Sequence, residues 1–271
     1  MSNALHRQTQ SSASRLPRPA NDRYAEAVIG GIRTACVNRE QLTQLMVEDC
    51  LAARESVEPA RLVFASNGHA IAMAATDKNF REAFEAADLV HADGQPVVTA
   101  SRLFARTAVP ERSATTDFIH DAAKAAVEHG LSIFLLGATE AVNARCAEIL
   151  KASYPGLKIA GRRNGYFTRG EEAKVCAEIN RSGADVVFVG LGVPLEYDFC
   201  VRNKSKLGAG WVVTCGGCYN FVTGDYKRAP AWMQKHALEW LYRLMREPKR
   251  LFWRYAVTNP LAMFFLVTRT A

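Results

Sequence analysis

The residues best suited to chemistry are a carboxylate and an amide, each placed directly after a short apolar segment. Asp93 and Gly94 follow the segment 88–91, and Asn67 lies just beyond the segment 61–65. If both segments are parallel strands, their carboxyl ends share one edge of a sheet, where such sheets bind ligands. A carboxylate there can remove a proton from a hydroxyl group, which an amide can orient. An Asp-Gly pair is also a common turn, so both interpretations stay open at this point.

Three further apolar segments run into glycines immediately before a predicted helix. These glycine turns are Gly137-Ala-Thr139, Gly190-Leu-Gly192 and Cys215-Gly-Gly217. Glycine lets the backbone approach a phosphate, and a helix N-terminus presents free N–H groups and the positive end of its dipole. Together the turns favour a phosphate-bearing ligand. None of them matches G-x-G-x-x-G, which makes a nicotinamide dinucleotide the weaker candidate.

Metal-binding patterns are sparse in this sequence. There is no Asp-x-Asp, whereas enzymes that hold a nucleotide diphosphate through a divalent metal commonly need paired acids. We therefore predict a site without a metal and no cofactor. Among seven scattered cysteines the one close pair is Cys215 and Cys218, without a second pair or histidines at zinc spacing. Packing and a redox or metal role both remain open for this pair.

The net charge of +7 lies entirely in the last 46 residues. From Tyr226 onward there are nine basic and two acidic residues, so the preceding chain holds 25 of each sign. Aromatic residues are interleaved with these arginines: Trp240, Tyr242, Phe252, Trp253 and Tyr255. This pattern is typical of a helix on a membrane surface, with rings at headgroup level and arginines reaching phosphates. Ordinary packing on the core is the alternative.

Apolar strands alternate with helices through the body of the chain. The predicted strands are 61–65, 88–91, 131–137, 157–160, 185–190 and 211–214. The predicted helices include a helical stretch after Gly68 up to Ala87 and the segments 96–104, 116–129, 139–153, 168–181 and 194–206. Near-continuous apolar strands separated by helices indicate a parallel sheet covered on both faces, an α/β Rossmann-like fold. The tail is predicted to be helical from Ala229 to Tyr255, with a break at Pro248.

Length and composition suggest how the chain is organised. Its 271 residues, 49% of them hydrophobic, can form a large buried core and exclude a disordered chain or a disulfide miniprotein. The apolar stretch 255–267 has about 13 residues, whereas a spanning helix needs roughly 20. We expect a disordered leader (1–23) without a signal-peptide core, a Rossmann-like core (24–225) and a basic aromatic membrane-associating appendage (226–271) in a cytoplasmic protein.

These motifs resemble those of the WecG/TagA/CpsF family of bacterial glycosyltransferases. The resemblance covers roughly residues 40–258 and is most specific at Leu238-Glu-Trp-Leu-Tyr-Arg243, followed by Glu247-Pro-Lys-Arg250. It also includes Asn67 and the segments 87–94, 110–117, 134–137, 154–156, 165–167, 190–194 and 224–230. The resemblance implies a Rossmann-like, inverting, metal-independent enzyme that transfers a sugar from a UDP-sugar to a polyprenyl-diphosphate-linked acceptor at the inner face of the cell membrane.

The resemblance also assigns roles to individual residues. Asp93 becomes the general base, with Asn67 beside it as a second catalytic residue. The appendage would supply Arg243, Arg250 and Arg254 to the substrate phosphates, so that one segment both docks on lipid and neutralises the diphosphate. The other positions predicted to bind substrate are Gly94, Arg112, Asp117, Gly137, Gly190, Gly192, Pro194, Glu196, Gly216, Gly217, Asn220 and Arg228.

Several positions depart from the family pattern near the expected ligand edge. Ala65 stands where Thr is usual, and Thr115 where Gly is usual. The usual Pro-x-Gln-Glu reads Pro194-Leu-Glu196-Tyr197, and the usual Phe-Asp reads Tyr219-Asn220. These changes leave the reaction type standing but leave the donor sugar open between N-acetylmannosamine and another hexose such as glucose.

The sequence therefore predicts a UDP-sugar-dependent glycosyltransferase of cell-surface polysaccharide synthesis. Its expected partners are the UDP-sugar, a polyprenyl-diphosphate-linked glycan and an anionic membrane surface, with a homo-oligomer left open and no nucleic acid. The alternative is an α/β nucleotide-binding protein without transferase activity, either an oxidoreductase or a basic nucleic-acid-binding module.

Overall fold

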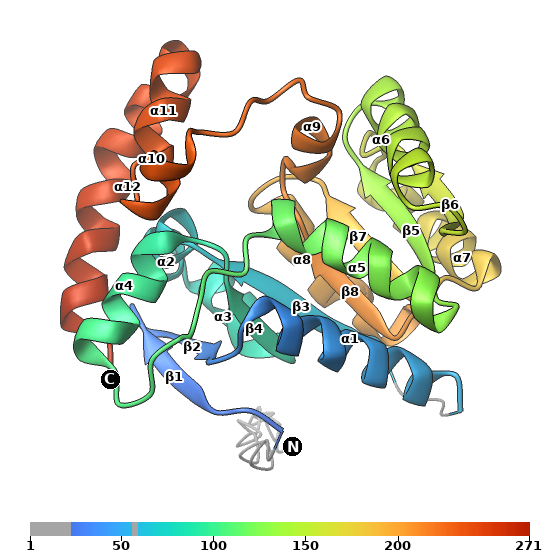
Figure 1. The fold of residues 1–271 in the computed structure, drawn as a ribbon, viewed down its shortest axis with the longest axis horizontal. Coiled ribbons are helices and arrows are strands. Elements are labelled where there is room, and N and C mark those ends of the chain that lie inside the picture. The colour runs from blue at the N-terminus through green and yellow to red at the C-terminus, as the bar shows by residue number, and fades with distance from the viewer. Residues whose placement is uncertain (1–22, 56–58) are drawn as a thin grey trace, which may run out of the picture.

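A six-stranded parallel sheet forms the centre of the computed structural model, which describes residues 23–55 and 59–271 (Figure 1). The strand order is β4-β3-β8-β7-β5-β6. The strands are β3 (Arg61–Ser66), β4 (Leu89–Ala92), β5 (Ser132–Gly137), β6 (Lys158–Arg163), β7 (Val186–Gly190) and β8 (Trp211–Thr214). The predicted α/β class and all six predicted strands are confirmed. The predicted leader lies outside the described residues, except for Arg23.

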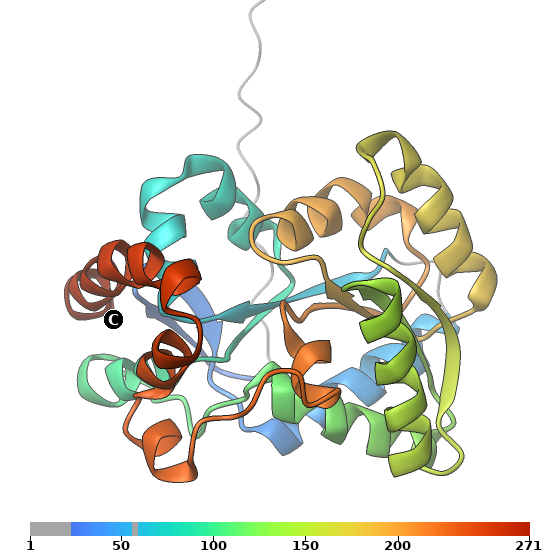
Figure 2. The same cartoon turned by 90° about the horizontal axis from the view of Figure 1, so that it is seen from above.

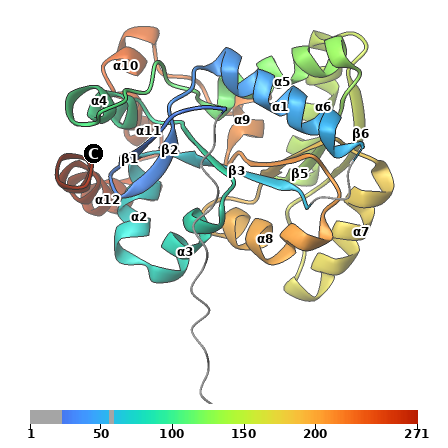
Figure 3. The same cartoon turned by 90° about the horizontal axis from the view of Figure 1, so that it is seen from below.

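Helices cover both faces of this sheet, as the views from above and below show (Figures 2 and 3). On one face lie α1 (Arg39–Ala53), α5 (Thr115–His129) and α6 (Glu140–Ser153); on the other lie α3 (Lys78–Ala86), α7 (Glu172–Ser182) and α8 (Leu195–Asn203). Strand residues alternate between the two cores: Phe134 and Val187 belong to one, and Ile133 and Phe188 to the other. The four inner strands β3, β8, β7 and β5 are therefore apolar on both faces, which explains their continuous apolar sequences, whereas the edge strand β6 is only partly buried.

Several short elements were not predicted. Strands β1 (Glu26–Ile29) and β2 (Ile32–Ala35) form a small antiparallel hairpin. The helical stretch expected up to Ala87 is two helices, α2 (Gly68–Thr76) and α3, because Asp77 ends the first and caps the second. The short helix α9 (Cys218–Val222) was not predicted either. By contrast, α4 (Gln95–Phe104) confirms the predicted helix 96–104, and the 3-10 turns η1 (Arg169–Glu171) and η2 (Lys204–Lys206) lie within the predicted helices 168–181 and 194–206.

The basic tail folds into three helices: α10 (Ala231–Lys235), α11 (Glu239–Arg246) and α12 (Pro248–Thr268). The predicted break at Pro248 is confirmed, whereas the break between α10 and α11 was not predicted. Pro248 starts α12, where its missing N–H costs nothing, and the helix continues through Pro260. α12 packs mainly on α2 and also contacts α4, and a Cβ at Gly68 would lie 3.4 Å from the Cβ of Ala262. None of the described helices is both long and apolar enough to cross a membrane.

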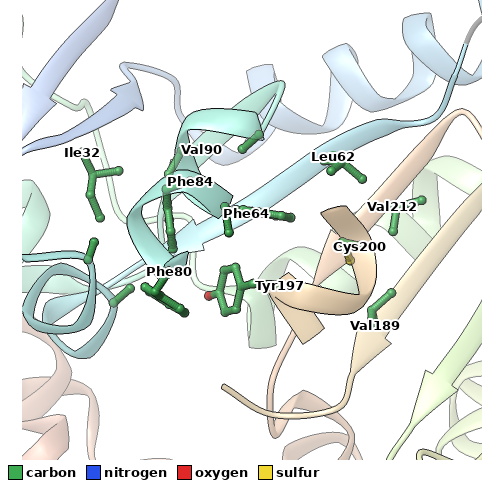
Figure 4. Packing of buried hydrophobic residues seen from close by; sticks show 14 of the residues in the cluster. Ile32, Leu62, Phe64, Phe80, Phe84, Val90, Val189, Tyr197, Cys200 and Val212 are labelled. Atoms are coloured by element: carbon green, nitrogen blue, oxygen red, sulfur yellow. The ribbon is translucent and has the colours of Figure 1, made fainter. Parts of the chain in front are cut away.

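An aromatic cluster fixes the start of α8 against β3 (Figure 4). The Tyr197 ring meets the Phe64 ring edge-on, with centroids 4.9 Å apart, and stacks on the Phe84 ring at 5.1 Å. Its hydroxyl donates a hydrogen bond to the carbonyl of Ala65 at 3.1 Å. Tyr197 and Ala65 are both departures from the family pattern. In this chain the two residues are in direct contact. The aromatic packing of Tyr197 also fixes the position of Glu196, the residue before it.

Candidate active site

Asp93 and Asn67 meet at the carboxyl edge of the sheet. Because Ser66 and Ala92 are paired in the β3–β4 register, the residues that follow them are neighbours. The Asn67 Oδ1 atom accepts the N–H of Ala70 (3.1 Å) as the N-cap of α2, so its Nδ2 group must face the other way. That group donates to Asp93 Oδ2 at 3.2 Å. The helix cap thus orients the amide toward the carboxylate.

The other oxygen of Asp93 is held by Thr115 at the start of α5. Both the N–H (2.8 Å) and the hydroxyl (3.2 Å) of Thr115 donate to Asp93 Oδ1. Burial opposes ionisation of Asp93, but the Arg112 guanidinium and these donors outweigh it and lower the pKa of the carboxyl group. Asp93 is therefore ionised at neutral pH and ready to accept a proton.

Arg112 connects this site to the tail. Its Nε donates to the backbone carbonyl of Asp93 at 2.7 Å, and its Nη1 forms an ion pair with Glu239 of α11 at 2.8 Å. Both ionic side chains are mostly buried. The predicted site residue Arg112 thus lies beside the carboxylate, where it positions the Asp93 backbone and links it to the appendage.

The three glycine turns lie together at the same edge, as predicted. They follow β5, β7 and β8, which are neighbours in the sheet. At Gly137, where φ is +131°, a Cβ would come within 2.2 Å of the carbonyl oxygen of Gly190, so no side chain fits. Glu196 joins the other two turns, because its Oε2 accepts the N–H groups of Gly192 and Gly216, each at 3.0 Å.

Asp117 and Arg228, both predicted to bind substrate, are paired with each other. The Arg228 guanidinium binds both carboxylate oxygens of Asp117, and it also donates to Gln234 Oε1 at 2.7 Å. This bidentate pair joins the segment after α9 to the start of α5. Asn220 lies in α9, where its backbone carbonyl accepts the N–H of Tyr226 at 2.9 Å. These contacts indicate that Asp117, Asn220 and Arg228 hold the segment after α9 in place against α5.

The tail arginines separate into two groups. The Arg243 guanidinium lies 5.7 Å from the Phe221 ring centroid and 5.9 Å from that of Tyr226, and Arg250 lies 6.0 Å from Tyr226. Arg243 borders a cavity of about 230 Å³ between the core and α11, which we call the roof pocket, and Arg250 contacts its Tyr226 wall. The roof pocket is lined by Phe221, Asp225, Tyr226, Lys227, Tyr242, Arg243, Arg246 and Glu247.

Arg254 lies elsewhere, against α2 rather than at the roof pocket. Burial and the charge of Arg254 together lower the pKa of His69 to about 4. The His69 imidazole, two residues after Asn67, is therefore neutral. Within the described residues, His69 Nδ1 and Arg254 Nε are buried without a hydrogen-bond partner, and so is Ser66 Oγ at the end of β3. Sequence reasoning missed His69 and Ser66. Their closeness to Asn67 at the end of a strand was the feature of the sequence that could have identified them.

Residues 27–271 match the model of the glycosyl transferase WecG/TagA/CpsF family. The chain belongs to this family. It is a glycosyltransferase, and the resemblance drawn from its motifs is confirmed. The alternative of a nucleotide-binding protein without transferase activity is not favoured by this match.

Two curated members of the WecG/TagA/CpsF family carry the name N-acetylglucosaminyldiphosphoundecaprenol N-acetyl-beta-D-mannosaminyltransferase. The one from Bacillus spizizenii is 31% identical over 181 residues, 67% of this chain and 68% of the relative. The one from Bacillus subtilis is 31% identical over 184 residues, 68% of this chain and 70% of the relative. The similarity therefore extends over most of the fold rather than a single motif.

Cys215 and Cys218 of this family member are both buried beneath the glycine turns. Burial raises the pKa of each thiol well above its ordinary value, so neither is a reactive thiolate at neutral pH. The Cys218 thiol lies 3.5 Å from the carbonyl oxygen of Thr115. Both are free thiols, and they pack among apolar residues of the core that contains α5. These surroundings match the packing interpretation of the pair.

Replacing Thr115 by Ala should raise the pKa of Asp93, because the hydroxyl that stabilises the charged carboxylate is lost while the backbone N–H remains. Activity that requires ionised Asp93 falls as pH drops through its pKa, so the acid limb of kcat/KM should move to higher pH. Rate profiles of both proteins down to pH 4 would show this. An unmoved acid limb in the Thr115→Ala variant would contradict the role given to this hydroxyl.

Proposed function

We propose that the protein is an inverting, metal-independent transferase that moves N-acetylmannosamine or another hexose from a UDP-sugar to a polyprenyl-diphosphate-linked sugar in cell-surface polysaccharide synthesis. The observation that carries this proposal is an ionised Asp93, held by Asn67 and Thr115 at the carboxyl edge of a parallel sheet. The names of the two relatives, which act on a diphosphoundecaprenol-linked sugar, support the class of acceptor.

In this mechanism Asp93 removes the proton from the attacking hydroxyl of the acceptor. The oxygen bonds to the anomeric carbon while the bond to UDP breaks on the opposite side, which inverts the configuration. The second carboxyl group at this edge, Glu196, is occupied by the N–H groups of two turns. This leaves Asp93, whose Oδ2 carries one long hydrogen bond, as the group suited to act as base.

The charge that develops on the departing diphosphate needs stabilisation without a metal. The N-terminus of α6, which follows the glycine turn at Gly137, presents N–H groups and a positive dipole end. The roof pocket adds the cationic side chains of Lys227, Arg243 and Arg246. Such fixed donors and cations can stabilise a diphosphate leaving group as a bound cation would.

The test is UDP release in the presence of EDTA. UDP-N-acetylmannosamine and UDP-glucose are each offered with a polyprenyl-diphosphate-linked N-acetylglucosamine, and we expect at least one to react at a rate that EDTA leaves unchanged. Loss of turnover in EDTA with recovery in Mg²⁺ or Mn²⁺ would refute the metal-free mechanism. No UDP release from either donor, together with a steep salt-dependent affinity for DNA or RNA, would instead favour the nucleic-acid-binding alternative.

We further propose that the enzyme is peripheral at the inner face of the cell membrane and docks through the tail. The outward face of α12 is apolar from Phe252 to Val267, including Trp253, which is 75% exposed, and Phe264, which is 59% exposed. Monomeric proteins rarely leave such a continuous apolar strip in water. Lys249, which is exposed near the start of this strip, would meet anionic headgroups.

A further inference from the structure

Glu196 joins two of the glycine turns through one buried carboxyl group. It lies in the first turn of α8 and is only 2% exposed. Its Oε2 accepts the N–H of Gly192, in the turn after β7, and the N–H of Gly216, in the turn after β8. Gly216 has a φ of +52°, a conformation that such a bond helps to maintain. The shape of this edge of the site therefore depends on Glu196.

The position of Glu196 is fixed by the residue that follows it. Tyr197 is inserted among Phe64, Phe80 and Phe84 and bonded to the Ala65 carbonyl (Figure 4). Because α8 is anchored in this way, its first turn cannot move away from the glycines without breaking the aromatic cluster. The Glu196 carboxyl group therefore stays within hydrogen-bonding distance of Gly192 and Gly216.

The surroundings favour the neutral form of this carboxyl group. Burial, with a smaller contribution from the charge of Asp93, raises the pKa of Glu196 to about 8 against the opposing effect of the turn N–H groups. The other titratable groups that face it are Cys215 after β8 and Tyr197 and Cys200 on its own helix. All three have a pKa raised by burial and stay neutral, so Asp93 is the charged member of this group.

We propose that Glu196 is a positioning residue that works as a neutral acid, holding the two glycine turns in the shape that receives the donor diphosphate, and that its ionisation weakens donor binding. This inference rests on the proposed function. A protonated carboxyl group has nearly the shape of the glutamine amide that is usual in the family at this position. Once ionised, it places a negative charge beneath turns that must accept the negative phosphates.

Glu196→Gln tests the proposal, because the amide oxygen can still accept both N–H groups but the side chain cannot ionise. In the unchanged enzyme the KM for the UDP-sugar should rise roughly tenfold from pH 7 to pH 9, with kcat changed much less. In Glu196→Gln this rise should be absent. The matched control is Asp198→Asn, which removes one carboxylate from the exposed side of the same helix and should keep the rise. A rise of equal size in Glu196→Gln would overturn the proposal.

A second measurement needs no substrate and separates the two proposals. Glu196 ionises near pH 4.5 when unfolded and near pH 8 when folded, so the enzyme should lose stability as pH rises between these values. The Tm advantage of Glu196→Gln should grow from pH 5 to pH 8 and then level off. A Tm difference that does not change with pH would by itself refute the proposal that Glu196 is a neutral acid in the folded enzyme. Absence of transfer from any UDP-sugar would refute the proposed function, and the donor-binding role with it, whatever the Tm difference shows.

Discussion

Replacing Asp93 by Asn should lower kcat by roughly 100-fold or more, the usual contribution of a general base, and should leave UDP binding nearly unchanged. The asparagine oxygen can still accept the Thr115 N–H, so the turn before α4 keeps its shape. What is lost is the negative charge, the ability to take a proton and the hydrogen bond from Asn67 Nδ2, because the new amide group is itself a donor. Initial rates and a UDP titration on the same preparation would measure the two effects separately.

The matched control for this variant is Asp77→Asn. Asp77 caps α3 at the surface, and asparagine is an equally good N-cap, so this change should affect neither folding nor turnover. If the Asp93→Asn protein melts normally, binds UDP and still turns over at a near-normal rate, Asp93 is not the base.

Replacing Trp253 and Phe264 together by Glu should weaken binding to anionic vesicles by at least roughly 30-fold. Each new charge near an anionic surface costs about 1 kcal/mol, and the loss of two aromatic rings removes apolar burial at the interface as well. Both side chains point outward from α12, so the fold should be unaffected. Vesicle co-sedimentation measures the binding, and transfer to a water-soluble acceptor analogue should continue.

Surface substitutions are preferable to removing the tail. Phe265 and Leu266 of α12 belong to the main core, so truncation would expose apolar surface and confuse misfolding with lost docking. The control is Leu51→Glu with Val127→Glu, two partly exposed apolar positions on α1 and α5. Equal vesicle binding by the control pair and the α12 pair would contradict docking through α12.

The sheet and the side chains at its carboxyl edge could be predicted because both follow from local patterns. Strands buried on both faces leave continuous apolar segments, and parallel strands put their carboxyl ends on one edge. Asn67 and Asp93 were therefore expected to be close, and their hydrogen bond confirms it. The contribution of the Thr115 hydroxyl was not predicted, since it depends on where α5 begins relative to β4.

The arrangement of the tail could not be read from its own sequence. The break between α10 and α11 passes through Ala237 at a φ of +60°, which no residue pattern indicates. α12 continues through Pro260 because contacts with α2, such as Ala262 against Gly68, stabilise a helix that its own propensity would end. The grouping of Arg243 and Arg250 around Tyr226, with Arg254 at α2, depends on the same long-range packing.

The packing of α12 along α2 has a consequence for geometry. The first residue before α2 is Asn67, which touches Asp93, and α12 lies against the nine residues of α2, a length of about 14 Å. A bilayer bound to the outer face of α12 would thus lie at a set height from the reacting carboxylate, with no flexible linker to vary it. The enzyme would then select acceptors by the distance of their reactive hydroxyl from the lipid surface as well as by their sugar chemistry.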